Sequence, residues 1–109
     1  MLKRNYKLNA EDFLQVINNH ELKENKYFLL MYQKNNINQC RAGVIVSSKI
    51  SNLATERNLL KRQIKAILNQ KLCLIPQKYN LVVIAKKFAL DKDFKELEEA
   101  LTELLVSLS

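Results

Sequence analysis

The chain has 109 residues, 48% of them apolar, which is enough for one domain with a modest hydrophobic core. Its net charge of +7 is typical of proteins that bind a polyanion, such as a nucleic acid or an acidic membrane surface. A single glycine excludes P-loops, dinucleotide fingerprints and nucleophile elbows, because each of these motifs needs several glycines at fixed spacing.

The cysteines and the N-terminus indicate the compartment. Cys40 and Cys73 are too few for a disulfide framework, and with a single histidine they make a poor zinc site. No apolar run approaches the roughly 18 residues that cross a bilayer, and the N-terminus lacks the apolar stretch of a signal peptide. We therefore expect a cytoplasmic protein with reduced cysteines.

The first predicted element in chain order is a helix. Asn9 is expected to cap it, with Asp12 at its third position. Three apolar side chains then recur on one helical face: Phe13, Val16 and Ile17.

Two strands are predicted next. The apolar run 27–33 (YFLLMYQ) predicts a buried strand, and 41–47 predicts a second strand after the polar loop 34–39. Because the two strands are close in sequence, antiparallel pairing between them is favoured.

A long helix is predicted over 53–71, with its apolar positions along one side: Leu60, Ile64, Ile67 and Leu68. The apolar run 81–85 predicts a third strand, and Asp93 then caps a last helix with Glu96 as its capping-box partner. The core stripe of this last helix is Phe94, Leu97, Leu101, Leu104, Leu105 and Leu108. The order α-β-β-α-β-α describes a single α+β domain over 1–109, a two-layer sandwich of helices on a small sheet.

The long helix also carries a run of positive charge. Its polar side chains form two adjacent rows on one face: Arg57, Lys61 and Lys65 in one, Asn58 and Arg62 in the other. No acidic residue occurs between Glu56 and Asp91, so like charges repel along this face. An anionic partner would remove that cost, which suggests a phosphate-binding surface.

The distribution of charge along the chain supports a basic patch. Residues 1–75 hold 13 Lys and Arg against 5 Asp and Glu, a balance of +8, whereas residues 76–109 hold 5 against 6, a balance of −1. The excess is therefore concentrated in the first two thirds of the chain, as expected of a nucleic-acid-binding domain.

With these residues placed, the chain resembles the protein component of bacterial ribonuclease P over nearly its whole length. The strongest similarity is the motif R-x-G-x-x-V-S-x-K from Arg41 to Lys49, followed by R-N-x-x-K-R from Arg57 to Arg62. Two further parts are the strand end VVIAKK at 82–87 and the triplet E-D-F in the first helix. All of these parts occur in the order and at the spacing of that family.

The resemblance implies a four-stranded sheet in which the basic helix forms a left-handed βαβ crossover. It also implies the protein subunit of an endoribonuclease that matures the 5′ ends of tRNA. In that family the RNA subunit performs the hydrolysis with Mg²⁺ that is bound mainly by the RNA, and the protein supplies no catalytic residue. No residue of this chain is assigned as a metal ligand. The implied partners are ribonuclease P RNA and the 5′ leader of precursor tRNA, with a monomeric protein in a 1:1 ribonucleoprotein.

The resemblance assigns roles to individual residues as well. RNA contacts would come from the second strand, the turn after it and the basic helix: Arg41, Lys49, Asn52, Arg57, Asn58, Lys61, Arg62 and Lys65. A cleft between the first helix and the sheet would hold the leader, lined by Phe13, Ile17, Met31 and Lys86. Ile17 and Met31 stand where the family often has aromatic residues, and Ser51 stands where a glycine is common.

One alternative stays open from the residues themselves. A basic helix face is also consistent with another RNA- or DNA-binding module, such as a ribosome-associated protein, without a role in tRNA processing. A stand-alone enzyme is disfavoured, because the sequence has no convincing Ser-His-Asp or Cys-His arrangement.

Overall fold

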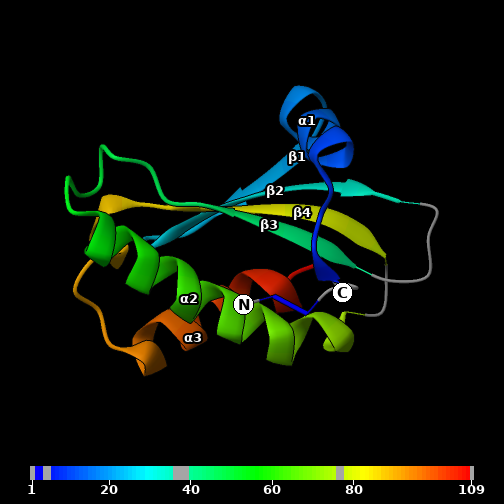
Figure 1. The fold of residues 1–109 in the computed structure, drawn as a ribbon. Coiled ribbons are helices and arrows are strands. Elements are labelled where there is room, and N and C mark those ends of the chain that lie inside the picture. Colours follow the sequence, from blue (N-terminus) through cyan, green and yellow to red (C-terminus); the bar gives the residue numbers. More distant parts are fainter. Residues whose placement is uncertain (1, 4–5, 36–39, 76–77, 109) are drawn as a thin grey trace.

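The structure, a computed structural model, describes residues 2–3, 6–35, 40–75 and 78–108. Its centre is a four-stranded sheet in the spatial order β1-β2-β4-β3. The strands are β1 (Glu21–Glu24), β2 (Phe28–Lys34), β3 (Arg41–Ile45) and β4 (Tyr79–Ala85). Helices α2 (Ala54–Lys71) and α3 (Phe94–Val106) cover one face of the sheet, and the short helix α1 (Ala10–Asn18) lies on the opposite face (Figure 1). Short 3₁₀ turns, η2 (Leu72–Leu74) and η3 (Lys87–Ala89), follow α2 and β4. The predicted α+β class is confirmed.

Strand β4 decides how the sheet is connected. It pairs antiparallel with β2 and parallel with β3, so the expected antiparallel pairing between the strands at 27–33 and 41–47 is wrong. Six of the seven residues of β4 are buried, because the strand is covered on both faces. This strand therefore takes the interior position, and β3 is placed beyond it. Nearness in sequence favours pairing only where no more apolar strand competes for the same partner.

The parallel strands β3 and β4 are joined through α2. This βαβ crossover is left-handed, as the resemblance implied (Figure 1). Right-handed crossovers are strongly favoured in general, so the spacing of the elements does not predict this geometry. The crossover places α2 against β3 and α3, and one side of the helix is left open.

Strand β1 is an element that the residue pattern does not reveal. Three of its four residues are exposed, and its sequence ELKE has no apolar alternation. Antiparallel pairing with β2 holds it in the sheet as an edge strand. Charged side chains are common on such edges, because they discourage pairing with other chains.

The first and last helices begin at the predicted caps. The side chains of Asn9 and Asp93 accept hydrogen bonds of 2.8 Å from the backbone amides of Asp12 and Glu96, respectively. Each cap satisfies one of the free amides of the first helical turn, a contribution of about 0.5–2 kcal/mol. Helix α2 has no such bond from its own N-cap residue, Leu53.

The main core lies between the sheet and the two long helices. The predicted apolar positions of α2 are all buried there, and so are those of α3 from Leu97 onward, while Phe94 is 36% exposed. Cys40 is buried in this core, Cys73 is exposed, and neither forms a disulfide. Burial raises the pKa of the Cys40 thiol, which is therefore protonated at neutral pH.

A smaller apolar cluster lies on the other face, beneath α1. Its buried members are Val16 of α1, Val82 of β4 and Leu8 of the N-terminal segment. The Leu8 amide donates to the Ala42 carbonyl at 3.1 Å, so the N-terminal segment follows the outer edge of β3. These contacts fasten α1 to the sheet.

Candidate nucleic-acid interface

The turn between β3 and α2 is held by polar contacts. The Ser51 hydroxyl accepts a hydrogen bond from the Leu53 amide at 3.1 Å and donates to the Glu56 carboxylate. The Arg57 guanidinium donates to the Ser51 carbonyl at 2.8 Å. Ser51 thus connects the turn to the first residues of α2, whose N-cap residue makes no side-chain hydrogen bond. Glycine is common at this position in the family that the sequence resembles.

Helix α2 presents a basic face, which we define as Arg57, Asn58, Lys61, Arg62 and Lys65. Asn58 and Arg62 are exposed, and the row Arg57, Lys61 and Lys65 is half-buried. The apolar positions of the helix are buried in the main core instead. The helix therefore separates an inward apolar side from an outward cationic side, as its sequence pattern predicts.

Among the residues that the structure describes, no carboxylate forms an ion pair with the basic face. Among the described residues the one ion pair joins Lys86 to Glu24, and none of the ten residues outside them is Asp or Glu. The only acid within α2, Glu56, is hydrogen-bonded by Ser51. The cations of α2 are therefore available to an anionic ligand.

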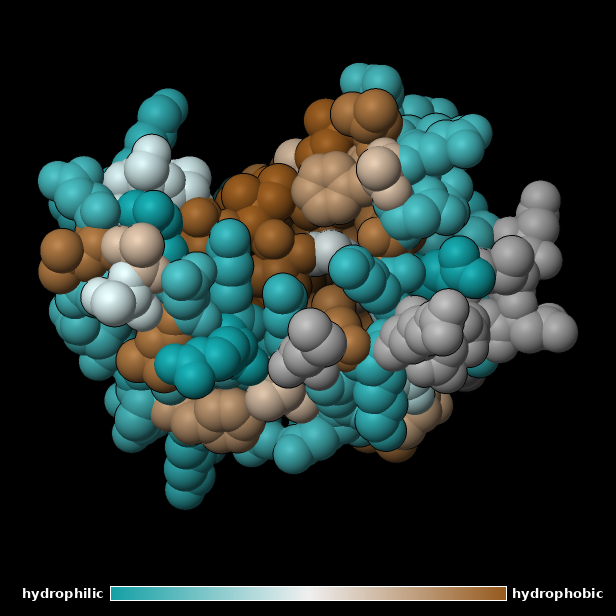
Figure 2. Space-filling model, viewed as in Figure 1, coloured by the Kyte–Doolittle hydropathy of each residue, from teal (hydrophilic) through white to brown (hydrophobic). Residues whose placement is uncertain are grey.

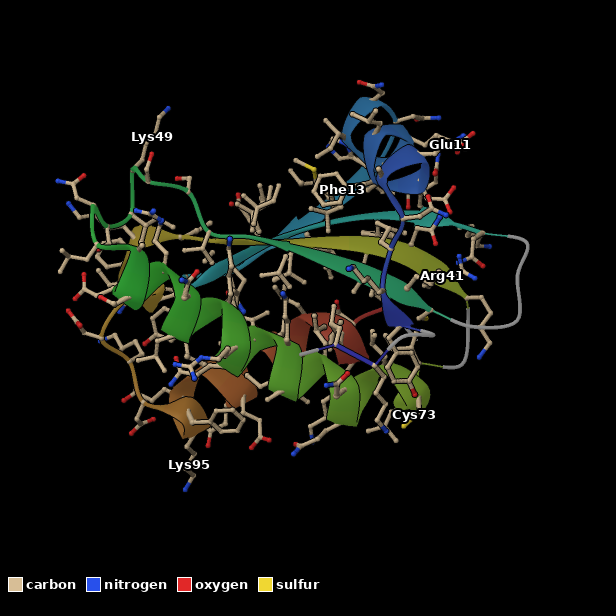
Figure 3. The ribbon with its side chains drawn as sticks, in the orientation of Figure 1. Glu11, Phe13, Arg41, Lys49, Cys73 and Lys95 are labelled. Atoms are coloured by element: carbon tan, nitrogen blue, oxygen red, sulfur yellow. The ribbon has the colours of Figure 1, made fainter. Side chains whose placement is uncertain are left out.

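Lys49 and Asn52 lie in the turn before α2, and both are exposed. Lys49 projects away from the domain (Figure 3). The N-terminus of α2 adds free amide groups and the positive end of the helix dipole, both of which favour an anion. Because Arg57 donates to Ser51 in this same turn, the turn and the basic face are linked.

On the other face of the sheet, α1 leaves part of the strands uncovered. Half-buried apolar side chains flank the cluster beneath α1, and we call them the apolar patch: Phe13, Ile17, Met31, Ile45 and Ile84. Figure 2 shows hydrophobic surface recessed between α1 and the hydrophilic side chains over α2. Three predicted cleft residues are thus brought together. Ile45 and Ile84, neighbours in the β3–β4 register, were not predicted, although strand alternation places Ile84 on the same face as Val82.

The only glycine of the chain sets the position of Phe13. A Cβ atom at Gly43 would lie 2.7 Å from Cε2 of Phe13, closer than carbon atoms can approach. A side chain at this position would therefore push the ring off β3. Figure 3 shows Phe13 between α1 and the sheet, in agreement with this contact.

Lys86, the fourth predicted cleft residue, lies directly after β4 and is already paired. Its ammonium group is 2.6 Å from Oε2 of Glu24 and 2.8 Å from the carbonyl oxygen of Asn25. The next residue, Lys87, is exposed. This end of the α1 face therefore carries less free charge than the basic face of α2.

Arg41 does not join the basic face of α2. Ala42 is buried in the main core, whereas Gly43 faces α1, so strand alternation places Arg41 on the α1 side of the sheet. There it lines a pocket with Asp12 and Gln15 of α1. The expected RNA contacts are thus divided between the two faces of the sheet.

Tyr32 of β2 has a shifted pKa. Burial, assisted by the Glu21 carboxylate, raises the pKa of Tyr32, so its phenol is neutral at physiological pH. Within the described part of the chain, no group of three or more His, Cys, Asp and Glu side chains could hold a metal ion. None of the described helices is long and apolar enough to cross a membrane.

The fold and these surfaces define a class of protein: a small α+β domain with a basic helix suited to nucleic acid. The family model described as ribonuclease P matches residues 2–109. The chain therefore belongs to the family of ribonuclease P proteins, the protein components of a tRNA-processing enzyme.

Individual relatives agree with this assignment. The ribonuclease P protein component of Thermotoga petrophila is 34% identical over 87 residues, which cover 80% of this chain and 73% of that protein. The corresponding protein of Mesoplasma florum is 29% identical over 107 residues, covering 97% of this chain and 92% of that protein. The solved structure of the RNase P protein from Thermotoga maritima has a TM-score of 0.83 at 31% identity, covering 94% of this chain and 97% of that chain. A ribosome-associated or DNA-binding module is not favoured.

Proposed function

We propose that this protein binds the catalytic RNA of ribonuclease P through the basic face of α2 and the turn before it. The observation that carries the proposal is the set of α2 cations that no Asp or Glu side chain pairs with in the described part of the chain. Arginine can fork onto a phosphate through two N–H donors, and asparagine can bridge phosphate and base edges. The contacting residues would be Lys49, Asn52, Arg57, Asn58, Lys61, Arg62 and Lys65.

The apolar patch is the proposed binding surface for the 5′ leader of precursor tRNA. A leader is single-stranded, so its bases can lie on the Phe13 ring and the neighbouring aliphatic side chains while its phosphates stay in water. Stacking on an aromatic side chain contributes about 1–3 kcal/mol per base. Ile17 and Met31 add aliphatic surface, and Lys86, with the exposed Lys87 beside it, would lie near the leader phosphates.

In this proposal the protein, a monomer in a 1:1 complex, contributes no nucleophile and no general base. The RNA performs the hydrolysis with bound Mg²⁺. The protein lowers the electrostatic cost of bringing two polyanions together, which raises the affinity for substrate and for Mg²⁺.

The test is cleavage of precursor tRNA by bacterial ribonuclease P RNA over a Mg²⁺ series, with and without the purified protein. The protein should lower the Mg²⁺ concentration needed for cleavage and should cleave nothing without the RNA. Absence of stimulation at physiological salt would contradict the proposal. Cleavage by the protein without RNA would contradict the division of labour.

A further inference from the structure

A pocket at the β1 edge of the sheet lies outside the surfaces described so far. Strand β1 begins at Glu21, opposite Tyr32, so the last two residues of β2 have no neighbour in β1. The pocket at this corner has a volume of about 410 Å³, and we call it the tyrosine pocket. The residues that line it include His20, Glu21, Tyr32, Gln33, Lys34 and Tyr79. It is at the opposite edge of the sheet from β3, the strand against which α2 packs.

The Tyr32 ring is held in place from two sides. Its hydroxyl donates to the carboxylate of Glu21, its neighbour across the strand pair. Tyr79 meets it in a T-shaped contact, with ring centroids 5.5 Å apart and an angle of 89° between the planes. Tyr79 is only 8% exposed, whereas Tyr32 is half-buried, so Tyr32 offers the accessible ring surface. Because the ring is already fixed, a flat ligand that stacks on it costs little side-chain freedom.

Hydrogen-bonding groups of several kinds surround this ring. Nδ1 of His20 donates to the Val16 carbonyl at 2.8 Å, which leaves Nε2 for a ligand. The Gln33 amide offers both a donor and an acceptor, and the Glu21 carboxylate has acceptor positions beyond the one that Tyr32 uses. Proteins recognise single unpaired bases with this combination of an aromatic ring and groups that hydrogen-bond the edge of the base.

The size and charge of the pocket limit the ligand further. Its volume lies in the range of small-molecule sites, about 300–1,000 Å³. Glu21 and Lys34 contribute one charge of each sign, so a polyanion would meet a single cation there. A nucleoside with one phosphate matches these properties better than a polyphosphate or a long RNA strand.

We propose that the tyrosine pocket binds a free guanine nucleotide that carries one phosphate. Guanine presents its ring N–H and its amino group side by side, and these two donors match the acceptor positions of the Glu21 carboxylate. The base stacks on Tyr32, the Gln33 amide donates to the guanine carbonyl, and Lys34 supplies the cation for the phosphate. This inference does not depend on the proposed function, because none of these residues belongs to the surfaces proposed for RNA.

The test is isothermal titration calorimetry of the purified protein with three nucleoside monophosphates. Inosine monophosphate differs from guanosine monophosphate only by lacking the amino group, so it should bind about 10-fold more weakly, as expected for the loss of a hydrogen bond to a charged group. Uridine monophosphate should bind more weakly still. Equal affinities for the three nucleotides, or no binding of guanosine monophosphate, would overturn the inference.

Two variants assign the contacts to residues. Glu21→Gln should lower the affinity for guanosine monophosphate about 10-fold and reduce its advantage over inosine monophosphate. Lys34→Met should remove the advantage of guanosine monophosphate over guanosine. Glu99→Gln, which removes an exposed acid of α3, is the control and should change neither. Wild-type affinities for Glu21→Gln, or an equal loss in the control, would contradict the proposed role of Glu21.

Stability and RNA measurements separate this role from others. Glu21 is exposed, so Glu21→Gln should unfold at the wild-type temperature and should stimulate ribonuclease P RNA as the wild type does. A lower unfolding temperature with equal losses for every nucleotide would indicate a structural role and overturn the inference. Binding of a short single-stranded RNA that contains guanine, without binding of the free nucleotide, would overturn it as well. If wild-type protein fails to stimulate the RNA, it is the proposed function that fails.

Discussion

The two faces of the sheet are built on different physical principles. The basic face of α2 is a set of like charges that are neighbours in sequence, on one helix, and no carboxylate of the described residues is paired to them. The apolar patch gathers side chains from α1, β2, β3 and β4, and the cation at its end, Lys86, is already paired. RNA bound by the first face should therefore be sensitive to salt, whereas RNA bound by the second should depend on contact area and ring stacking.

The largest effect is expected from removing the charges of α2. Replacing Arg57, Lys61, Arg62 and Lys65 together by alanine should weaken binding of ribonuclease P RNA. If about four phosphate contacts are lost, the slope of log affinity against log salt should fall by about 3–4. The measurement is a binding titration over a salt series.

A matched control removes the same number of positive charges elsewhere: Lys23, Lys26, Lys92 and Lys95. Its slope should change much less, because these lysines lie outside the basic face. An unchanged slope for the α2 variant, or equal changes for both, would mean that the basic face is not the contact surface.

A smaller effect with the opposite salt behaviour is expected at the apolar patch. Phe13→Ala should weaken binding of leader-bearing tRNA to the holoenzyme by about 1–3 kcal/mol and leave mature tRNA nearly unaffected. The salt slope should stay as in the wild type, since no charge is removed. Leu14→Ala on the same helix is the control, because Leu14 is 61% exposed and outside the patch. Equal losses for both tRNAs would indicate a folding defect instead.

The contact between Gly43 and Phe13 is tested by stability. Gly43→Ala places a methyl group against the ring, and overpacking of this kind costs about 1–3 kcal/mol. The free energy of unfolding, measured with urea, should fall by that amount in the wild-type background and by much less alongside Phe13→Ala. Equal losses of stability in the two backgrounds would show that Gly43 is needed for the conformation of β3 and not for the contact with the Phe13 ring.

The smallest effect is expected from freeing Lys86. Glu24→Gln breaks an ion pair whose side chains are 33% and 56% exposed, so the free energy of unfolding should change by only about 0–1 kcal/mol. The freed cation should raise the salt slope for leader-bearing tRNA by less than about 1. Glu99→Gln, an exposed acid of α3, is the control. An identical slope in both variants would place the leader away from Lys86.

Much of the local structure could be predicted from the sequence. Caps such as Asn9 and Asp93, and the apolar spacing of α2, depend on contacts within a few residues, and the structure confirms them. Strand β1 was missed because a polar edge strand has no pattern of its own and exists only through pairing with β2. The expected pairing of the strands at 27–33 and 41–47 was wrong because β4 competes for the position between them.

Some of the candidate site residues could also be predicted from the sequence, whereas others could not. The basic face of α2 was visible in the sequence, since residues three and four apart on a helix must share a side. The cleft residues Phe13, Ile17 and Met31 came from the family resemblance, and the structure adds Ile45 and Ile84 beside them. No sequence pattern indicated that Arg41 lies on the α1 side of the sheet, because its face depends on which side of β3 the core occupies.

The sequence by itself determined where the helices begin, which side of α2 is charged, and the family to which the chain belongs. These properties depend on residues that are close to one another in the sequence. Only the tertiary structure decided that β4 lies inside the sheet, that the crossover through α2 is left-handed, and that a glycine on β3 makes room for a ring on α1. Those outcomes depend on competition for burial between segments far apart in the chain. Such competition cannot be inferred from the pattern of neighbouring residues.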